Sequence, residues 1–193
     1  MSSERFVTAA PLPEAQDLTR RYVDLAQPRL GTVVTFATDD FFADKSRMLD
    51  PAPPVFYPDR FDDHGKWMDG WESRRKRTPG HDHAVVRLGQ RGTIAAIDVD
   101  TSFFTGNFPP EAMIEAADTA EEPGETDWAV IVPRAPLKGD SHNLFTLESD
   151  APVRWLRLNI YPDGGVARLR VFGTIAKDWS SIAPDETIDL GAM

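Results

Sequence analysis

The sequence predicts an all-β fold, an antiparallel β-sandwich or jelly roll, and three observations support this prediction. Short segments show the period-two alternation of strands. The 16 prolines and 13 glycines are spread between these segments as turn residues. Helix signals are weak, with one short candidate helix within residues 12–26. At 193 residues and 41% hydrophobic composition, the chain is long and apolar enough for one packed domain with long loops.

Six segments carry the strand pattern, and in most of them apolar side chains alternate with polar ones. Along the chain they are residues 32–38, 83–88, 92–104, 127–133, 153–161 and 166–173. A glycine-bounded GQRG (89–92) separates the second segment from the third. PDGG (162–165) joins the last two segments. We expect a hairpin there, because proline presets φ and the residues that follow tolerate positive φ.

The segment 39–82 is too long for a simple turn, so we expect it to be functional or partly structured. It contains GKWMDGWESRRKRTPGHD (65–82). Trp67 and Trp71 are four residues apart, and on a helical turn they would share one face and anchor the loop. The basic run 74–77 is either a solvated face or the source of one or two arginines that clamp a carboxylate.

The charge balance narrows the class of partner. With 21 basic and 31 acidic residues, the formal net charge is -10. This balance argues against nucleic acid and against an anionic membrane surface as partners. The absence of cysteine excludes disulfides, cysteine-ligated zinc and a cysteine nucleophile. No signal-peptide core and no transmembrane-length apolar run occur, so we expect a cytoplasmic protein.

Three of the four histidines fall within twenty residues: His64, His81 and His83. His81 stands beside Asp82, and such a pair can be a general base, a metal ligand or a simple surface pair. A divalent ion held by these histidines and nearby aspartates is conceivable. The spacing does not demand one, because no HExxH or comparable pattern is present, and we therefore expect no metal or other cofactor.

Asp98 and Asp100 share one face of their expected strand, where two like charges need compensation. Arg157, Arg168 and Arg170 face outward on other strands, so an outer ionic ladder is the simpler interpretation. The SFFTGNFPP stretch (102–110) follows at once. Its aromatic residues, glycine and asparagine indicate a tight, walled loop at a strand end, where ligand sites often form.

Several longer motifs together resemble the allantoicase (allantoate amidinohydrolase) family. They occur in the family's order and cover most of residues 24–173. The motifs are FATDDFF, GKWMDGWESRRKRTPGHD, DVDTSFFTGNFPP, VPRAPL, SHNLF and RLNIYPDGGVARLRVFG. The resemblance implies a galactose-binding-domain-like jelly roll, hydrolysis of allantoate to ureidoglycolate and urea in purine degradation, and an oligomeric protein.

The resemblance also sets expectations for domain organisation. We expect an N-terminal extension (1–23), an allantoicase-like sandwich (24–175) and a tail (176–193) at the position of an inter-repeat linker. Family members usually carry two tandem repeats, whereas this sequence has one, and its last residues, ETIDLGAM, resemble YVDLAQPRLG at the start of the domain. Its partner would then be a second copy or a separate second-repeat chain.

The substrate that the resemblance implies, a small anion with two ureido groups, suggests roles for individual residues. Arginines would bind its carboxylate, and the candidates are Arg75, Arg134 and Arg157, with Arg74 behind them. Carboxylate and amide groups would hold the ureido arms, and the candidates are Glu72, Asp100 and Asn107. Proton transfer would fall to His81 oriented by Asp82, then to Asp69, Glu72 or His142. Aromatic walls would exclude water, and the candidates are Trp67, Trp71 and Phe104.

Two other functions fit the same sequence. A jelly roll can be a non-catalytic module that binds a small ligand, because fold alone does not establish catalysis. The single repeat also fits a half-subunit that needs a second-repeat partner to complete its site. The density of His, Asp, Glu and Arg in the aromatic-rich loops favours an enzyme.

Overall fold

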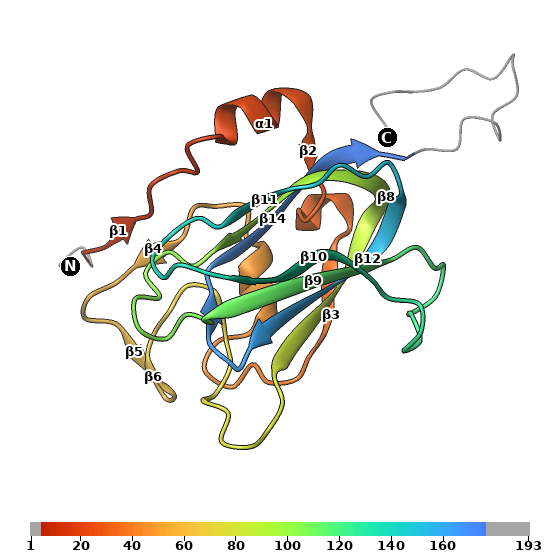
Figure 1. Ribbon diagram of the computed structural model, residues 1–193. Helices are drawn as coiled ribbons and strands as arrows, with labels where there is room; N and C mark the ends of the chain where they lie inside the picture. The colour runs from red at the N-terminus through yellow and green to blue at the C-terminus, as the bar shows by residue number, and fades with distance from the viewer. Residues whose placement is uncertain (1–4, 177–193) are drawn as a thin grey trace, which may run out of the picture.

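In the computed structural model, which describes residues 5–176, one long strand, β8 (Asp82–Asp100), organises the fold (Figure 1). Its first part pairs with β3 (Val33–Ala37) and β12 (Pro152–Tyr161). Its later part pairs with β14 (Arg168–Ile175) and β11 (Leu144–Thr146). All of these pairings are antiparallel. Because its two parts pair with different strands, β8 contributes to both layers of a β-sandwich.

The remaining main strands extend the two layers outward from β8. The strand order is β10-β9-β12-β8-β14-β2, with β9 spanning Glu111–Ala117, β10 Ala129–Pro136 and β2 Val23–Asp24. The predicted all-β sandwich is therefore confirmed. The predicted hairpin at 162–165 is wrong, because β12 and β14 each pair with β8, at different parts of its length, and not with each other. The PDGG segment carries the chain from one layer to the other.

GQRG does not interrupt the strand either, and β8 continues through it with a large bulge. On β12 only two positions separate Val153 from Trp155, but their partners on β8, Gly92 and Arg87, are five positions apart. Such a bulge bends a strand and increases its twist, which lets one strand pass between two layers. A Cβ on Gly89 would lie 1.9 Å from the carbonyl oxygen of Leu30, so this close approach requires glycine.

The main core lies between the layers and follows the expected alternation. Leu156, Leu158 and Ile160 from β12 are fully buried against neighbouring strands. Truncating such a side chain to alanine costs about 2–5 kcal/mol of stability. Further large core residues come from β8, β9, β14 and the 310 helix η2 (Lys45–Leu49), among them Met48, Leu49, Val86, Leu88, Ile97, Val99, Ile114, Leu169 and Val171.

The segment 39–82 is partly structured, as expected. It holds η2 and the short strands β4 (Val55–Phe56), β5 (Phe61–Asp62), β6 (Gly65–Lys66) and β7 (Trp71–Glu72). β5 pairs with β6 as a small hairpin, and β7 pairs with β13 (Gly165–Val166). Trp67 and Trp71 therefore do not share a helical turn.

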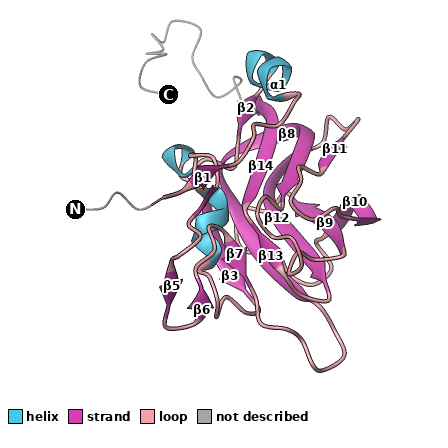
Figure 2. Ribbon diagram, turned by 90° about the vertical axis from the view of Figure 1, so that its left-hand side faces the viewer, coloured by secondary structure: helices cyan, strands magenta, loops and turns pink. Residues whose placement is uncertain are grey.

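The N-terminal segment covers the outer side of the β8–β14 layer (Figure 2). It comprises β1 (Val7–Thr8), paired with β4, and α1 (Ala15–Arg21), followed by β2 and the 310 helix η1 (Pro28–Leu30). α1 confirms the short predicted helix, and Asp17 in its first turn and Arg20 and Arg21 in its last suit the helix dipole. No helix within residues 5–176 has the length and apolarity to cross a bilayer.

The predicted outer ionic ladder is right in its register but wrong in its exposure and ion pairs. Arg168 and Arg170 lie opposite Asp100 and Asp98 on the neighbouring strand, but they pair with Asp69 and Asp24. Asp98, Asp100 and Arg168 are each only 1% exposed. Leu12 packs with Ala96 and Phe172 on the same side of the layer and shields it from solvent. The predicted tail (176–193) lies outside the described residues from 177 onward.

Candidate functional site

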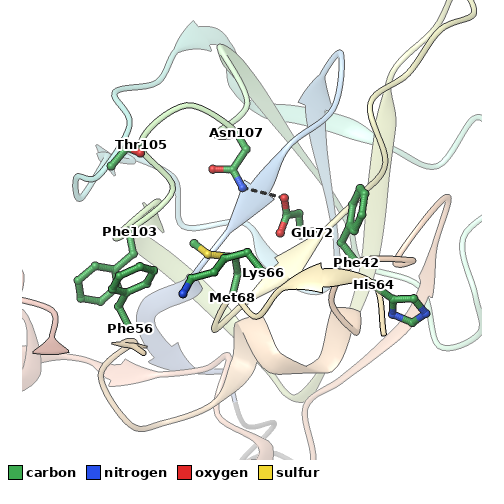
Figure 3. Close-up of a pocket in the computed structure, with 9 residues that line it drawn as sticks. All are labelled: Phe42, Phe56, His64, Lys66, Met68, Glu72, Phe103, Thr105 and Asn107. Carbon is green, nitrogen blue, oxygen red and sulfur yellow. Dashed lines mark hydrogen bonds between the residues drawn. The ribbon is translucent and has the colours of Figure 1, made fainter. Parts of the chain in front are cut away.

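Two adjoining pockets open where the loops at one end of the sandwich meet, and Figure 3 shows the residues that line the first. The first has a volume of about 420 Å³ and the second about 340 Å³. Both are lined by Phe42, Glu72 and Asn107, so these residues mark their junction. We call the two pockets together the Glu72–Asn107 site. The first pocket is also lined by Phe56, His64, Lys66, Met68, Phe103 and Thr105.

Glu72 owes its position to the tryptophan before it. Trp71 is fully buried, and its indole Nε1 donates a 2.8 Å hydrogen bond to the carbonyl of Asp39. Since successive side chains of a strand point to opposite sides, Glu72 faces away from the core and lines the pocket. Pairing of Glu72 with Gly165 fixes the short strand at its outer edge.

Asn107 is held by the same strand pair. Its carbonyl accepts a 2.7 Å hydrogen bond from the backbone N–H of Gly165. Its side-chain Nδ2 donates to Glu72 Oε1, also at 2.7 Å. Burial raises the pKa of the Glu72 carboxyl above its ordinary value, and the nearby charge of Asp62 adds to this, whereas the Asn107 hydrogen bond lowers it. Glu72 can therefore keep its proton at a higher pH than a solvated glutamate.

Aromatic rings form part of the wall of the first pocket. Phe56 and Phe103 stack with ring centroids 5.5 Å apart. The ammonium of Lys66 lies over the ring of Phe56 at 4.9 Å and over that of Phe61 at 4.7 Å. These apolar faces reduce the access of water and strengthen polar contacts made inside the pocket.

The basic run 74–77 supplies cations to the second pocket. Arg75 lines it and is exposed, and within residues 5–176 it forms no ion pair. Lys76 also lines it, but its Nζ lies 2.7 Å from Asp82 Oδ1, and Arg74 pairs with Asp39 at 2.6 Å. The run is thus neither wholly a solvated face nor wholly a clamp.

Comparisons with known proteins identify the family of this chain. The family model described as the allantoicase repeat matches residues 23–176. The chain belongs to the allantoicase family. Its relatives include "Probable allantoicase 2" of Burkholderia mallei, which is 52% identical over 189 residues, and "Probable allantoicase" of Stutzerimonas stutzeri, which is 55% identical over 174 residues.

The alignments cover 96% and 89% of this chain but only 56% and 53% of those two relatives. The chain therefore spans about half the length of the curated relatives that it matches. The crystal structure of allantoicase from Saccharomyces cerevisiae superposes with a TM-score of 0.64 at 32% identity, over 86% of this chain and 45% of that one.

More distant structures share the fold alone. A chitosan-binding module from Paenibacillus sp. superposes with a TM-score of 0.56 at 16% identity, over 79% of this chain and 100% of the module. Together with the allantoicase structure, it confirms the predicted galactose-binding-domain-like jelly roll.

Only three of the residues proposed from the allantoicase resemblance, namely Glu72, Asn107 and Arg75, line the two pockets. The pockets are not lined by Asp69, Trp67, Trp71 or Phe104. Asp69 pairs with Arg168 at 2.8 Å, and Phe104 is fully buried. Arg60 stacks on the indole of Trp67 at 4.3 Å.

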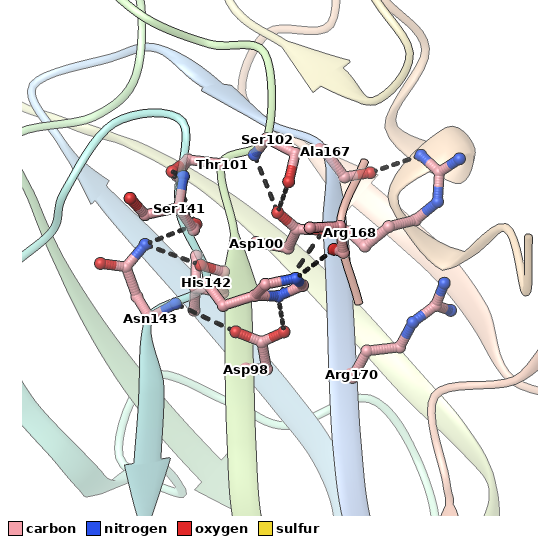
Figure 4. A network of polar contacts seen from close by, with 12 residues as sticks. Asp98, Asp100, Thr101, Ser102, Ser141, His142, Asn143, Ala167, Arg168 and Arg170 are labelled. Carbon is pink, nitrogen blue, oxygen red and sulfur yellow. Dashed lines mark hydrogen bonds and ion pairs between the residues drawn. The ribbon is translucent and has the colours of Figure 1, made fainter. Parts of the chain in front are cut away.

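His142 and Asp100 lie together in a second place (Figure 4). They line a pocket of about 240 Å³ together with Ala10 and Leu12 of the N-terminal segment. His142 Nδ1 is 2.7 Å from Asp98 Oδ2, and Nε2 is 3.0 Å from the carbonyl of Ala10. Asp100 accepts hydrogen bonds from the backbone and side chain of Ser102. We call this group the His142 cluster. The Asp98 hydrogen bond, with further help from Ala10 and the charges of both aspartates, raises the pKa of His142 to about 9.

His81, Arg134 and Arg157 lie in a third place, on the outer face of the β8–β12–β9–β10 layer. His81 Nε2 is 2.9 Å from Asn159 Oδ1, while its sequence neighbour Asp82 binds Lys76 and Thr38 instead. Arg157 and Arg134 are paired with Glu115 and Glu111 respectively. The structure thus separates the predicted site residues into three groups.

The histidines do not converge on a metal. His64 stacks on Phe41 with ring centroids 4.4 Å apart, and the rings of His81 and His83 are 6.3 Å apart. Across residues 5–176, no group of three or more His, Asp or Glu side chains has the arrangement of a metal site.

The sequence interpretation assigned no substrate-binding role to Lys66, Phe56 or Phe103, although all three line the first pocket. Lys66 lies within the aromatic- and charge-rich stretch 65–82 that the sequence singled out. A basic residue among aromatic residues was the available signal.

Proposed function

We propose that this chain forms an allantoicase site at Glu72 and Asn107, where allantoate is hydrolysed to ureidoglycolate and urea. One observation carries the proposal. A carboxyl whose pKa is raised by burial is held by an amide at the junction of two pockets in a member of the allantoicase family. Glutamate in such an environment can act as an acid and then as a base near neutral pH.

The reaction breaks one C–N bond at the carbon that carries both ureido groups and the carboxylate. Protonated Glu72 donates its proton to the nitrogen of the departing ureido arm, which leaves as urea. Water adds its oxygen to the vacated carbon and returns a proton to the Glu72 carboxylate. One water is consumed, and the acid is restored for the next turnover.

The other residues of the site orient and shield this step. Asn107 keeps Glu72 Oε1 in place through its 2.7 Å hydrogen bond. The Phe56 and Phe103 rings limit water in a pocket whose volume lies within the range of roughly 300–1,000 Å³ typical of small-molecule sites. The proposal uses no metal or other cofactor. It places the reaction in the domain 24–175 of a cytoplasmic protein.

The test is release of urea and ureidoglycolate from allantoate by the purified 193-residue chain. We expect stoichiometric release above the uncatalysed rate, unaffected by a chelator. Glu72→Gln, which keeps the shape of the side chain but cannot donate a proton from a carboxyl, should reduce turnover by roughly 10²–10⁴-fold. Glu122→Gln, in an exposed loop, is the matched control and should leave turnover unchanged.

A second candidate function follows from the share of the relatives that this chain spans. About half of their length has no counterpart here, so the site could require a second-repeat chain or a second copy for activity. Mixing with a separately produced second-repeat chain tests this function. Urea release that occurs only in the mixture would favour it over the site of the single repeat.

A further inference from the structure

Lys66 is the cation of the first pocket, and its ammonium has unused capacity. It lies on β6, at the end of the β5–β6 hairpin. Its Nζ donates a 2.7 Å hydrogen bond to the carbonyl of Tyr57 and another to that of Pro58. An ammonium has three N–H donors, so one remains for a ligand.

The charge of Lys66 is also uncompensated. Its hydrogen-bond partners are neutral carbonyls, and within residues 5–176 it takes part in no ion pair. It is half-buried, with its ammonium against the faces of Phe56 and Phe61. A cation that is partly removed from water and fixed in place attracts an anion more strongly than a mobile surface cation does.

The other charged groups near the pocket do not cancel this attraction. Asp62 and His64, on the same hairpin, are exposed to solvent. Water and salt screen an exposed charge. Glu72 is the acidic residue that lines the pocket, and its side chain is engaged by Asn107.

The arginines predicted to bind the substrate carboxylate are less well placed. Arg134 and Arg157 are paired with glutamates on another face of the molecule. Arg75 has no ion pair in the described part of the chain and lines the neighbouring pocket, but it is exposed. An exposed pair contributes little, because water competes for both partners.

We propose that Lys66 binds the carboxylate of the substrate and so selects ureido acids over neutral ureides at this site. The inference rests on the proposed function for the identity of the natural substrate. Lys66 and Glu72 line the same pocket, so the carboxylate would be held at one side of the pocket and the departing ureido arm would lie toward Glu72. Lys66 is thus a specificity-determining residue and does not transfer a proton.

The test compares two unreactive ligands of similar shape, the anion N-carbamoylglycinate and its neutral amide, by titration calorimetry with the full chain. We expect the wild type to bind the anion more tightly than the amide. Lys66→Met should weaken binding of the anion by roughly 10–100-fold, the effect expected for one hydrogen bond to a charged group, and should change binding of the amide by less than about twofold.

Two further variants make the result decisive. Lys66→Arg keeps the charge and should retain a preference for the anion, which a purely structural role in the hairpin would not require. Arg75→Gln should alter anion binding by less than about threefold. The proposal is overturned if the wild type has no preference for the anion, if a folded Lys66→Met keeps that preference, or if Arg75→Gln removes it.

The binding experiment is separate from turnover. Glu72→Gln should still bind N-carbamoylglycinate in a Lys66-dependent manner. If Lys66 governs anion binding but the wild type releases no urea from allantoate, the proposed function fails and the role of Lys66 stands.

Discussion

The Glu72–Asn107 site and the His142 cluster each contain a carboxyl group whose pKa is raised by burial, Glu72 in one and Asp100 in the other. The surroundings of these two groups differ. Asp100 is 1% exposed, lies beneath the N-terminal segment and receives two hydrogen bonds from Ser102. Asp100 and His142 also line a pocket, of about 240 Å³, against the N-terminal segment. Glu72 lines two pockets and is the more accessible of the two carboxyls. A raised pKa marks a candidate reactive group only where the group can meet a ligand, and Glu72 meets this condition better.

His142 and Lys66, the basic residues of the two regions, also differ in how fully protein partners engage them. His142 uses both ring nitrogens, one toward Asp98 and one toward Ala10, and thereby fastens the N-terminal segment. Lys66 retains one donor in an open pocket. The His142 ring is thus fully engaged by protein partners, whereas the Glu72–Asn107 site keeps a hydrogen-bond donor for a ligand.

The largest expected difference in turnover is between the variants that remove the carboxyl group of each region. Asp100→Asn should change turnover less than about threefold per folded molecule, against the loss of roughly 10²-fold or more for Glu72→Gln. Steady-state urea release, normalised to the folded fraction from circular dichroism, measures both variants. A loss of turnover in a fully folded Asp100→Asn variant would mean that the reaction depends on the His142 cluster, against the proposal.

Asn107→Ala sharpens the comparison through pH. The Asn107 hydrogen bond lowers the pKa of Glu72, so its removal should raise that pKa further. If protonated Glu72 is the acid, turnover falls as pH rises through its pKa, and this descending limb should move to higher pH in the variant. We also expect about a tenfold lower maximum rate, because Glu72 loses its orienting partner. A pH–rate profile with an unmoved limb would remove Glu72 from the acid role.

His142 should instead control stability. Its pKa in the folded protein, about 9, exceeds the ordinary value of 6.5. The stabilisation is therefore complete below pH 6.5 and is lost as pH rises through about 9. His142→Gln should cost on the order of 2 kcal/mol at pH 6, less than the full linkage value because the ring is partly accessible to solvent, and much less at pH 10.

Urea denaturation at the two pH values measures this difference in the free energy of unfolding. A proton NMR titration of the His142 ring measures the pKa itself. Equal losses of stability at pH 6 and pH 10 would show that the ring acts through packing and not through its charge.

The smallest effect should come from the outer sheet face. Arg134 and Glu111 form an exposed pair, with Arg134 52% exposed. Arg134→Ala should change stability by less than about 1 kcal/mol and leave turnover unchanged. Thermal melts and the urea assay check both values, and a large loss of turnover would mean that this face contributes to the site.

The strand pattern predicted the fold class well, because the alternation of apolar and polar side chains along a strand reflects which of its faces is buried within one layer. It could not show that β8 continues through both layers, or that the chain crosses between the layers at 162–165. Both the bulge within residues 88–91 and this crossing depend on contacts distant in sequence. The outward face of Asp98 and Asp100 was predicted to be solvated for the same reason. Its cover, residues 9–22, comes from the other end of the chain.

The structure brings some of the predicted site residues together and separates others. Glu72 and Arg75 were chosen from one motif, and Asn107 from a loop at a strand end. His81 and Asp82, adjacent in sequence, point to different partners because neighbouring strand residues face opposite sides. Adjacency in sequence therefore does not make His81 and Asp82 a hydrogen-bonded pair. Lys66 was not selected from the sequence because the basic run 74–77 was the more prominent cationic feature of the same stretch.

The continuity of β8 has a consequence for unfolding. Within residues 5–176 this strand pairs with β3, β11, β12 and β14, which belong to both layers. Neither layer can lose its hydrogen bonds to β8 without exposing the face that the other layer covers. The amide protons of β8 should therefore exchange with solvent only in the global, cooperative opening of the molecule, whereas those of the β5–β6 hairpin should exchange through local fluctuations.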